Sequence, residues 1–323
     1  MKRSVRWGIL GAANIAKKQM IPAILHSDNG IVHAIASRSG KAKEFAMEFT
    51  IPTLFTDYHE LLQCEEIDAV YIALPNALHK EWIEKAITAG KHVLCEKPIV
   101  LQEHELAEIF VAANQRKVHV MEAFMYRFHP QIREAKRMLD AGVIGELLTI
   151  RSRFHFTMKD WQQDIRLQPE LGGGVLWDIG SYCVNSMLEF IGEEPVAIQV
   201  MSGRKDGVDT HVAVQFRFPN AVLGVADCSF YGPMTEEIDI IGTNGTMHLP
   251  HAFRPDRNED VGVIRIRTDE GEQQLEWIGK SYVAQVNAFQ EAVLGDSPLP
   301  YTQQQMLQHS RTLQKIVEQL KTS

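Results

Sequence analysis

Residues 7–16 read WGILGAANIA, and this short stretch decides the fold class of the first part of the chain. Its apolar run predicts a strand, and the residues that follow have helical spacing. Gly11, Ala13 and Ala16 occupy the three small-residue positions of the pattern G-x-G-x-x-G/A, with alanine in place of the second glycine. Small residues at such a turn let the backbone approach a pyrophosphate, which is held by N–H groups at the helix N-terminus. A plain tight turn is the alternative interpretation. The predicted cofactor-binding residues here are Gly11, Ala13, Asn14 and Ile15.

Strand-like and helix-like segments continue to alternate after this turn, which favours the dinucleotide interpretation. The predicted strands are 5–10, 31–36, 68–74, 92–95 and 118–121, and the predicted helices are 41–49, 77–89 and 103–116, with another starting near residue 14. Strands alternating with helices of this length are typical of βαβ units in a doubly wound parallel sheet.

The rhythm changes near residue 123, where we expect the domain boundary. The later part of the chain has β-type runs separated by short turns, at 196–201, 211–218, 222–230, 237–241 and 261–266, and helical patterns at 131–141, 174–191, 282–294 and 303–321. Successive strands with short turns predict an antiparallel meander covered by helices on one face. The expected organisation is α/β: domain 1–123 with a parallel sheet, then domain 124–323 with a large, mostly antiparallel open sheet.

Composition excludes several classes of protein. The chain has 323 residues, enough for about two domains, with 33 basic and 41 acidic residues and a net charge of −8. A nucleic-acid-binding protein needs a dense basic face, and no run of Lys or Arg supplies one, so we expect no nucleic acid partner. No segment reaches the ~18 uninterrupted apolar residues that a membrane span requires.

The cysteines and histidines predict neither a disulfide framework nor a metal centre. The four cysteines are scattered without CxxC spacing, which indicates buried thiols in a reducing compartment. The N-terminal apolar stretch is too short for a signal peptide, so we expect a cytoplasmic protein. Asp209, His211, His248 and His251 lack the spacing of a metal site, and we predict no metal.

The end of the second predicted strand bears on the choice of cofactor. An NAD-binding site places an acidic residue there, against the ribose 2′-hydroxyl. This chain has Ser37 and Arg38 instead, and no acidic residue before Glu44. Arginine can pair bidentately with a 2′-phosphate, and serine can donate a hydrogen bond to it. We therefore predict that Ser37 and Arg38 favour NADP(H) over NAD(H); a solvated loop arginine is the alternative.

Three further segments carry candidate site residues. LPNALH at 74–79 and CEKP at 95–98 each follow a predicted parallel strand, at the sheet edge where ligands bind. In the later part, GGGVLWDIGSY at 172–182 opens a helix on which Asp178 and Tyr182 stand four residues apart. A carboxylate and a phenol one turn apart could orient a sugar hydroxyl and relay its proton. The alternative interpretations are that Lys97 is a surface lysine, that Asp178 only interacts favourably with the helix dipole, and that Tyr182 is half-buried in the core.

Taken together, the segments GILGAANIA, ALPNALH, CEKP, MEAFMYRFHP and GGGVLWDIGSYCVN resemble the Gfo/Idh/MocA family of glucose-fructose oxidoreductases and inositol dehydrogenases. They occur in the family's order and span residues 7 to about 190. Tyr182 and the MEAFMYRFHP segment resemble, within the family, the dimeric dihydrodiol dehydrogenases and NADP-dependent xylose dehydrogenases.

The resemblance implies a Rossmann domain followed by a domain whose open sheet pairs subunits, and so a homodimer or homotetramer. It also implies that Lys97 and Tyr182 meet over the nicotinamide with Asp178 beside them, and that the peptide bond between Lys97 and Pro98 is cis. The further residues that it places along the cofactor or in the pocket are Leu74, Pro75, Asn76, His79, Glu96, Lys97 and Arg166.

The predicted function is hydride transfer between NADP(H) and a carbinol or carbonyl carbon of a carbohydrate-like small molecule, such as an aldose, a keto sugar or a dihydrodiol. Tyr182 is the predicted acid/base and Lys97 its electrostatic partner, and the reversed assignment remains open. Two alternatives remain: a redox-neutral sugar enzyme that retains its cofactor, and a non-catalytic dinucleotide sensor on the same fold.

Overall fold

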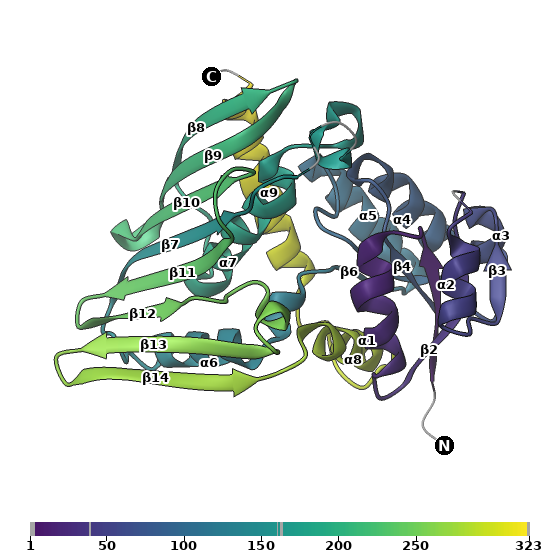
Figure 1. Ribbon diagram of the computed structural model, residues 1–323, viewed down its shortest axis with the longest axis horizontal. Coiled ribbons are helices and arrows are strands. Elements are labelled where there is room, and N and C mark those ends of the chain that lie inside the picture. Colours follow the sequence, from purple (N-terminus) through teal and green to yellow (C-terminus); the bar gives the residue numbers. More distant parts are fainter. Residues whose placement is uncertain (1–3, 39, 160, 162–163, 322–323) are drawn as a thin grey trace. The chain divides into compact units, whose positions relative to one another are not determined.

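The computed structural model describes residues 4–38, 40–159, 161 and 164–321 (Figure 1). The chain forms two compact units: Met1–Met125 with Tyr282–Met306, and Tyr126–Ser281 with Leu307–Ser323. The sequence analysis assigned residues 282–306 to the second domain, but they fold with the first unit. Helix α8 (Ser281–Leu294) supplies the reason, because Phe289 packs on Trp7 with ring centroids 5.4 Å apart.

The sheet of the first unit has six parallel strands in the order β3-β2-β1-β4-β5-β6. Its central strands are buried along their length, as the apolar runs predicted. The chain reverses its direction of winding between β1 and β4, the position where doubly wound sheets bind ligands at their carboxyl edge. The strands are β1 (Val5–Leu10), β2 (Gly30–Ala36), β3 (Thr53–Phe55), β4 (Ala69–Ile72), β5 (His92–Cys95) and β6 (Val120–Glu122).

The helices of this unit connect successive strands. A π-helical segment, η1 (Ala16–Met20), continues into α1, and a 3₁₀ turn, η2 (Asn76–Leu78), leads into α4. Strand β3 and helix α3 were not predicted, because three and six residues are too few to show a period. The helices are α1 (Ile21–Leu25), α2 (Ala42–Glu48), α3 (Tyr58–Gln63), α4 (His79–Thr88) and α5 (Glu103–Arg116).

The second unit contains an eight-stranded sheet in the order β14-β13-β12-β11-β7-β10-β9-β8. It is mostly antiparallel, as predicted, but it is not a simple meander: β7 lies between β11 and β10 and runs parallel to β10. Edge strand β14 was missed because its side chains are mostly exposed and polar. The strands are β7 (Leu147–His155), β8 (Ala197–Lys205), β9 (Val208–Arg217), β10 (Leu223–Ser229), β11 (Thr235–Gly242), β12 (Gly245–Leu249), β13 (Val261–Thr268) and β14 (Gly271–Ile278).

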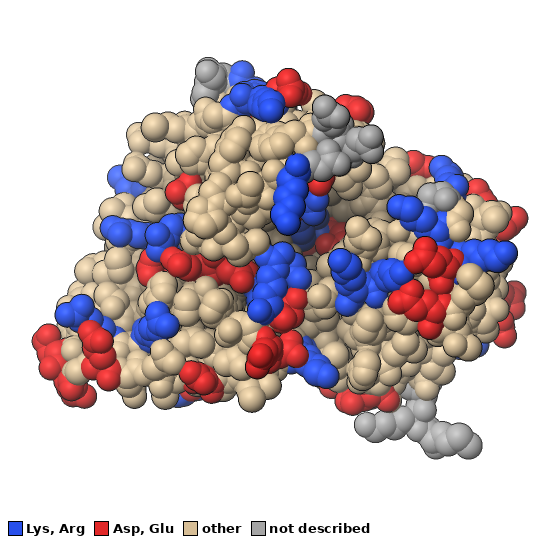
Figure 2. All heavy atoms as spheres, in the orientation of Figure 1, with Lys and Arg blue, Asp and Glu red and all other residues tan. Residues whose placement is uncertain are grey.

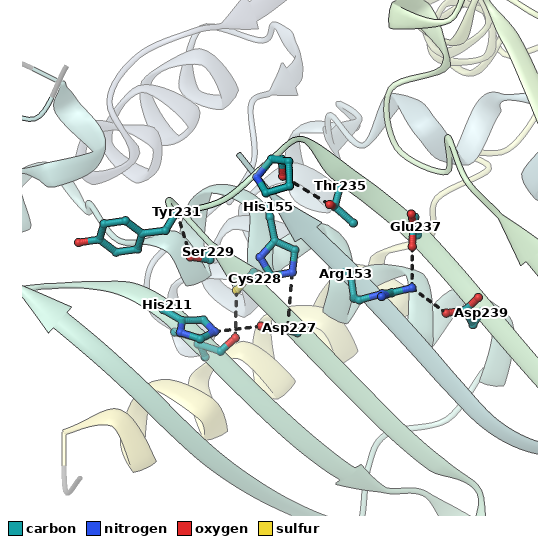
Figure 3. A network of polar contacts seen from close by, with 12 residues as sticks. Arg153, His155, His211, Asp227, Cys228, Ser229, Tyr231, Thr235, Glu237 and Asp239 are labelled. Carbon is teal, nitrogen blue, oxygen red and sulfur yellow. Dashed lines mark hydrogen bonds and ion pairs between the residues drawn. The ribbon is translucent and has the colours of Figure 1, made fainter. Parts of the chain in front are cut away.

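Helices cover one face of this sheet (Figure 1). They are α6 (Pro130–Asp140), α7 (Ser181–Ile191) with the π-helical segment η6 (Leu176–Gly180) before it, and α9 (Gln303–Leu320). The opposite face carries polar and charged side chains, part of which Figure 3 shows. Strand β9 alternates buried and more exposed residues accordingly, so the covered face holds the core.

Basic and acidic side chains are interspersed over the face shown in Figure 2. None of the described helices combines the length and apolar character that crossing a bilayer would need.

Candidate functional site

The turn after β1 is built so that only glycine fits at its first position. Gly11 has φ +98°, and a Cβ there would lie 2.5 Å from the carbonyl oxygen of Ala73, at the end of β4. The Gly11 N–H donates to the Ala36 carbonyl over 3.0 Å, which draws the end of β2 to the same place. Helical bonding starts at once, since Lys17 N donates to the Ala13 carbonyl. This backbone cradle at a helix start fits a dinucleotide pyrophosphate.

Arg38 leaves the end of β2 and is held by aromatic rings. Its guanidinium carbon lies 5.1 Å from the ring centroid of Tyr58 and 5.6 Å from that of Trp82, and its Nη2 lies 4.0 Å from Asp57 Oδ2. The side chain is still 60% exposed, whereas the preceding Ser37 is buried. Cation–π contacts of this kind orient a guanidinium without covering its N–H donors. Arg38 is therefore placed to meet an anionic group.

The segment after β4 is fastened by a buried histidine. His79 has no exposed surface; its Nδ1 lies 2.7 Å from the Pro98 carbonyl and its Nε2 2.9 Å from the Leu74 carbonyl. Burial lowers the pKa of His79, so the ring is neutral at pH 7 and donates to one of these carbonyls. The sequence analysis placed His79 along the cofactor. In the structure it ties two loops together, while Leu74, Pro75 and Asn76 are partly exposed.

The loop that carries Lys97 is clamped from its other side by a buried carboxylate. The Lys97–Pro98 peptide bond is cis, as the resemblance predicted. Ile99 N donates to Glu122 Oε1 over 3.0 Å, and the Tyr301 hydroxyl donates to Glu122 Oε2 over 3.3 Å. Glu122 is 1% exposed. The sequence analysis predicted no role for Glu122, although a carboxylate among apolar residues is a signal that it has a buried partner.

The other predicted residue of this loop also has a partner from a neighbouring strand. Glu96 Oε1 accepts a hydrogen bond of 2.6 Å from the hydroxyl of Tyr71, which is fully buried in β4. Burial, with the charge of Glu96, raises the pKa of Tyr71 well above its usual value, so the phenol stays protonated and remains a donor.

In the second unit, the triple glycine lets a loop and a strand approach the start of η6. A Cβ on Gly173 would lie 2.6 Å from the Arg166 carbonyl oxygen. Gly174 has φ +125°, and a Cβ there would lie 3.1 Å from Asp209 Cγ and nearer still to Oδ1. Asp209 Oδ2 accepts from Leu176 N over 2.7 Å. Burial raises the pKa of Asp209. Its role, an acceptor for the helix start, was not predicted.

Asp178 and Arg166 form an ion pair at this helix start. Arg166 Nε lies 2.7 Å from Asp178 Oδ2, and Arg166 Nη1 lies 3.0 Å from Asp164 Oδ2. The charge of Asp178 raises the pKa of Arg166. The sequence analysis named Arg166 as cofactor-binding; in the structure it holds two carboxylates of its own unit.

Tyr182 lies in a cluster of aromatic rings at the start of α7. Its ring centroid is 5.9 Å from that of Tyr126, 5.6 Å from Phe154 and 5.5 Å from Phe253, and the residue is 7% exposed. The Tyr126 hydroxyl donates to Asn185 Oδ1 over 2.6 Å, which fixes one wall of the cluster. The phenol is therefore held by apolar neighbours, a setting in which nearby charge acts strongly.

Two of the histidines that were considered as metal ligands, His211 and His248, pair with carboxylates. His211 Nε2 lies 3.1 Å from Asp227 Oδ1 on the open face of the sheet, where His155 approaches the same carboxylate (Figure 3). His248 pairs with Asp239 over 2.7 Å. Elsewhere among the described residues, three side chains have potential metal-ligand atoms within 4.8 Å of one another: His33, Cys64 and Glu66.

Comparison with known proteins identifies the family of both units. A model for an oxidoreductase family with an NAD-binding Rossmann fold matches residues 5–124, and a model for the GFO/IDH/MocA C-terminal domain matches residues 132–248.

Individual relatives are similar over most of the chain. A D-xylose 1-dehydrogenase (NADP(+)) of Haloferax volcanii is 35% identical, over 98% of this chain and 97% of its own. A trans-1,2-dihydrobenzene-1,2-diol dehydrogenase of Danio rerio is 34% identical over 78% of this chain and 76% of its own. The crystal structure of a 3-ketoreductase from Actinomadura kijaniata in complex with NADP and TDP-benzene superimposes with a TM-score of 0.90, at 29% identity, over 98% of both chains. These matches show that the chain belongs to the Gfo/Idh/MocA family of NAD(P)-dependent oxidoreductases.

Proposed function

We propose that this protein is an NADP(H)-dependent dehydrogenase or reductase that acts on a CH–OH or carbonyl group of a sugar-like molecule: an aldose, a keto sugar or a dihydrodiol. The main support for the proposal comes from the loop after β5, where buried His79 and Glu122 hydrogen-bond to the backbone beside Lys97. This loop and the Gly11 turn both follow parallel strands, so they share one edge of the sheet. The names of the relatives support the substrate class.

Residues of the first unit would hold the cofactor. The backbone of the Gly11 turn would bind the pyrophosphate, and Arg38 with Ser37 would bind the ribose 2′-phosphate. A bound nicotinamide supplies the site that accepts or gives the hydride. The aromatic rings beneath Arg38 support the preference for NADP(H), because they leave its guanidinium exposed to pair with a phosphate.

Lys97 and Tyr182 are proposed to handle the proton. An alcohol carbon is oxidised only as its hydroxyl proton leaves, so a base must stand within about 3 Å of that oxygen. A free phenol titrates near ~10, and lowering its pKa to about 7 needs roughly 4 kcal/mol of preference for the phenolate. An ammonium group beside the phenol supplies a charge of the right sign. We therefore assign the proton to Tyr182 and electrostatic support to Lys97.

Asp178 would oppose this shift if its charge were unbalanced. Its ion pair with Arg166 offsets that charge within the same unit. We propose that the pair lets Asp178 accept a hydrogen bond from a substrate hydroxyl without holding Tyr182 protonated.

A panel of sugars and polyols with NADP⁺ and NAD⁺, followed at the absorbance of reduced nicotinamide, tests the activity. The account predicts net reduction of NADP⁺ by at least one aldose or diol. Cleavage of a glycoside without net reduction would support the redox-neutral alternative. Cofactor binding with neither reaction would support the sensor alternative.

The cofactor preference has its own test in Arg38→Asp. A carboxylate repels a 2′-phosphate, so we expect the ratio of kcat/KM for NADP⁺ over NAD⁺ to fall by at least about 30-fold, or roughly 2 kcal/mol. An unchanged ratio would show that Arg38 does not select the cofactor.

We also propose that the protein works in the cytoplasm as a homodimer or homotetramer paired through the open face of the eight-stranded sheet. The polar face of Figure 3 supports this surface, since its charged groups pair within the sheet. Light scattering after gel filtration tests the assembly, and a monomer at micromolar concentration would contradict it.

A further inference from the structure

Glu236 is a buried acid that nothing described above uses. It lies in β11 and is 4% exposed, and its Oε2 has no hydrogen-bond partner among the described residues. Its neighbour Glu237 points to the opposite face of the sheet, where it pairs with Arg153 over 2.6 Å (Figure 3). Buried polar atoms are almost always paired, so this carboxyl oxygen is expected to have a partner beyond the described residues, such as a ligand or a water molecule.

The position of Glu236 connects it to Tyr182. In the sheet it lies opposite Phe154 of β7, and its carbonyl accepts from Ala252 N over 3.0 Å. The rings of Phe154 and of Phe253, the residue after Ala252, are stacked at 5.4 Å, and each contacts the Tyr182 ring. Glu236 therefore lies opposite one of the aromatic residues that pack against Tyr182, and its backbone bonds to the residue before the other.

Among the described residues, no ion pair to Glu236 is found. Arg254 and Arg257 are the cations whose charge acts on it, and the backbone of Arg254 hydrogen-bonds to its carboxyl group. Arg254 makes two hydrogen bonds to Asp256, of 2.8 and 2.7 Å, and Arg257 Nη1 donates to Met234 Sδ over 3.0 Å. Burial raises the pKa of Glu236 to about 7, against the opposing effect of the two arginines. Near neutral pH this carboxyl group can thus both donate and accept a hydrogen bond.

We propose that Glu236 is a specificity-determining residue of the substrate site, whose unpaired oxygen hydrogen-bonds a hydroxyl of the sugar-like substrate held beside Tyr182. This inference rests on the proposed function. A site built to bond a hydroxyl rejects an analogue without it far more strongly than an apolar pocket rejects an added methylene, because the buried polar group is then left unpaired. Glu236 would in this way select polyhydroxylated substrates.

Steady-state kinetics of three variants test the inference, with D-xylose and the other panel compounds as substrates. Glu236→Gln keeps the shape and removes the charge, Glu236→Leu removes both, and Glu237→Gln is the matched control on the other face. We expect Glu236→Leu to raise the KM for sugar by at least about 10-fold while kcat and the KM for NADP⁺ change by less than about threefold. Besides the ionisation of the proposed base, the wild type should show a second ionisation near pH 7 in kcat/KM, and Glu236→Gln should lack this second one.

An unchanged sugar KM and pH profile in both Glu236 variants would overturn the inference, and so would an equal effect of Glu237→Gln. If Glu236→Leu does not fold, the isosteric Glu236→Gln decides through the pH profile. If the wild type oxidises none of the compounds, the proposed function fails separately. Calorimetric titration of the NADP⁺-loaded protein with D-xylose then tests Glu236 alone, and absence of binding to the wild type or equal binding by Glu236→Leu would reject it.

Discussion

The Lys97 loop and the start of the Asp178 helix are positioned by different physical means. In the first unit, two buried polar side chains from distant segments, His79 and Glu122, hold the backbone after Lys97 by hydrogen bonds. In the second unit, Gly174 lets the backbone approach the carboxylate of Asp209 so closely that a methyl group would not fit. The clamp can therefore lose one hydrogen bond and keep the others, whereas a Cβ at position 174 would force the Asp209 carboxylate away from its hydrogen bond with Leu176 N.

Among the variants considered, Gly174→Ala should lower the free energy of unfolding the most. Gly174→Ala puts a Cβ against Asp209 and keeps a backbone with φ +125°. Strain and overpacking together should lower the free energy of unfolding by about 4 kcal/mol. The control is Gly192→Ala, at a positive φ of 81° with nothing within 4 Å of the new Cβ, for which we expect about 1 kcal/mol. Denaturant titration measures both, and equal losses would contradict the comparison.

Glu236, the buried acid of the second unit, should make the stability of the protein depend on pH. Because the pKa of Glu236 is raised from 4.5 to about 7, the folded protein binds an extra proton between these values and loses stability as pH rises through them. Glu236→Gln removes this loss. We expect the variant to match the wild type near pH 4.5 and to be more stable by about 3 kcal/mol at pH 8. Thermal melting across this pH range checks the prediction. If the stability of both proteins depends on pH in the same way, ionisation of Glu236 does not destabilise the folded protein.

Removing one acceptor oxygen from Glu122 should weaken its hydrogen bonding to the loop after Lys97. Glu122→Gln keeps one acceptor oxygen for the two donors, Ile99 N and the Tyr301 hydroxyl. Leaving one buried donor unpaired should cost about 2 kcal/mol. Since the loop beside Lys97 also loosens, kcat should fall by about 10-fold with little change in the Kd for NADP⁺. Melting and steady-state kinetics measure the two effects, and a stable variant with full kcat would show that the clamp is dispensable.

The smallest effect on stability is expected at the ion pair of the second unit. Arg166 is 43% exposed on its side chain, so solvent screens its pairing with Asp178 and Arg166→Gln should cost about 1 kcal/mol or less. The uncompensated carboxylate should, however, raise the pKa of the base in kcat/KM for alcohol oxidation. An unchanged pH profile would show that Asp178 lies outside the electrostatic range of the base.

Local patterns of the sequence predicted most of the fold. The strand, small-residue turn and helix around Gly11 predicted the parallel sheet of the first unit, and the β-type runs separated by short turns predicted the mostly antiparallel sheet of the second. Pairings between distant segments were not predictable in this way. Strand β7 lies between β10 and β11, which follow it by more than 60 residues, and Tyr282–Met306 returns to the first unit.

The polar residues that support the site escaped prediction for a related reason. Asp209 was considered only as a metal ligand, and no role was predicted for Glu122. Each acts through a hydrogen bond to the backbone of a segment more than 20 residues away, Leu176 N for Asp209 and Ile99 N for Glu122. Their residue types give no indication of such a partner, which only the tertiary structure brings near.

The most direct test of the central claim compares turnover and cofactor binding in Lys97→Met. If Lys97 supports proton transfer at the substrate oxygen, kcat for NADP⁺-dependent oxidation of the best panel substrate should fall by at least about 10³-fold, while the Kd for NADP⁺ stays within about threefold of the wild type. Turnover close to that of the wild type would remove Lys97 from the chemistry and contradict the account.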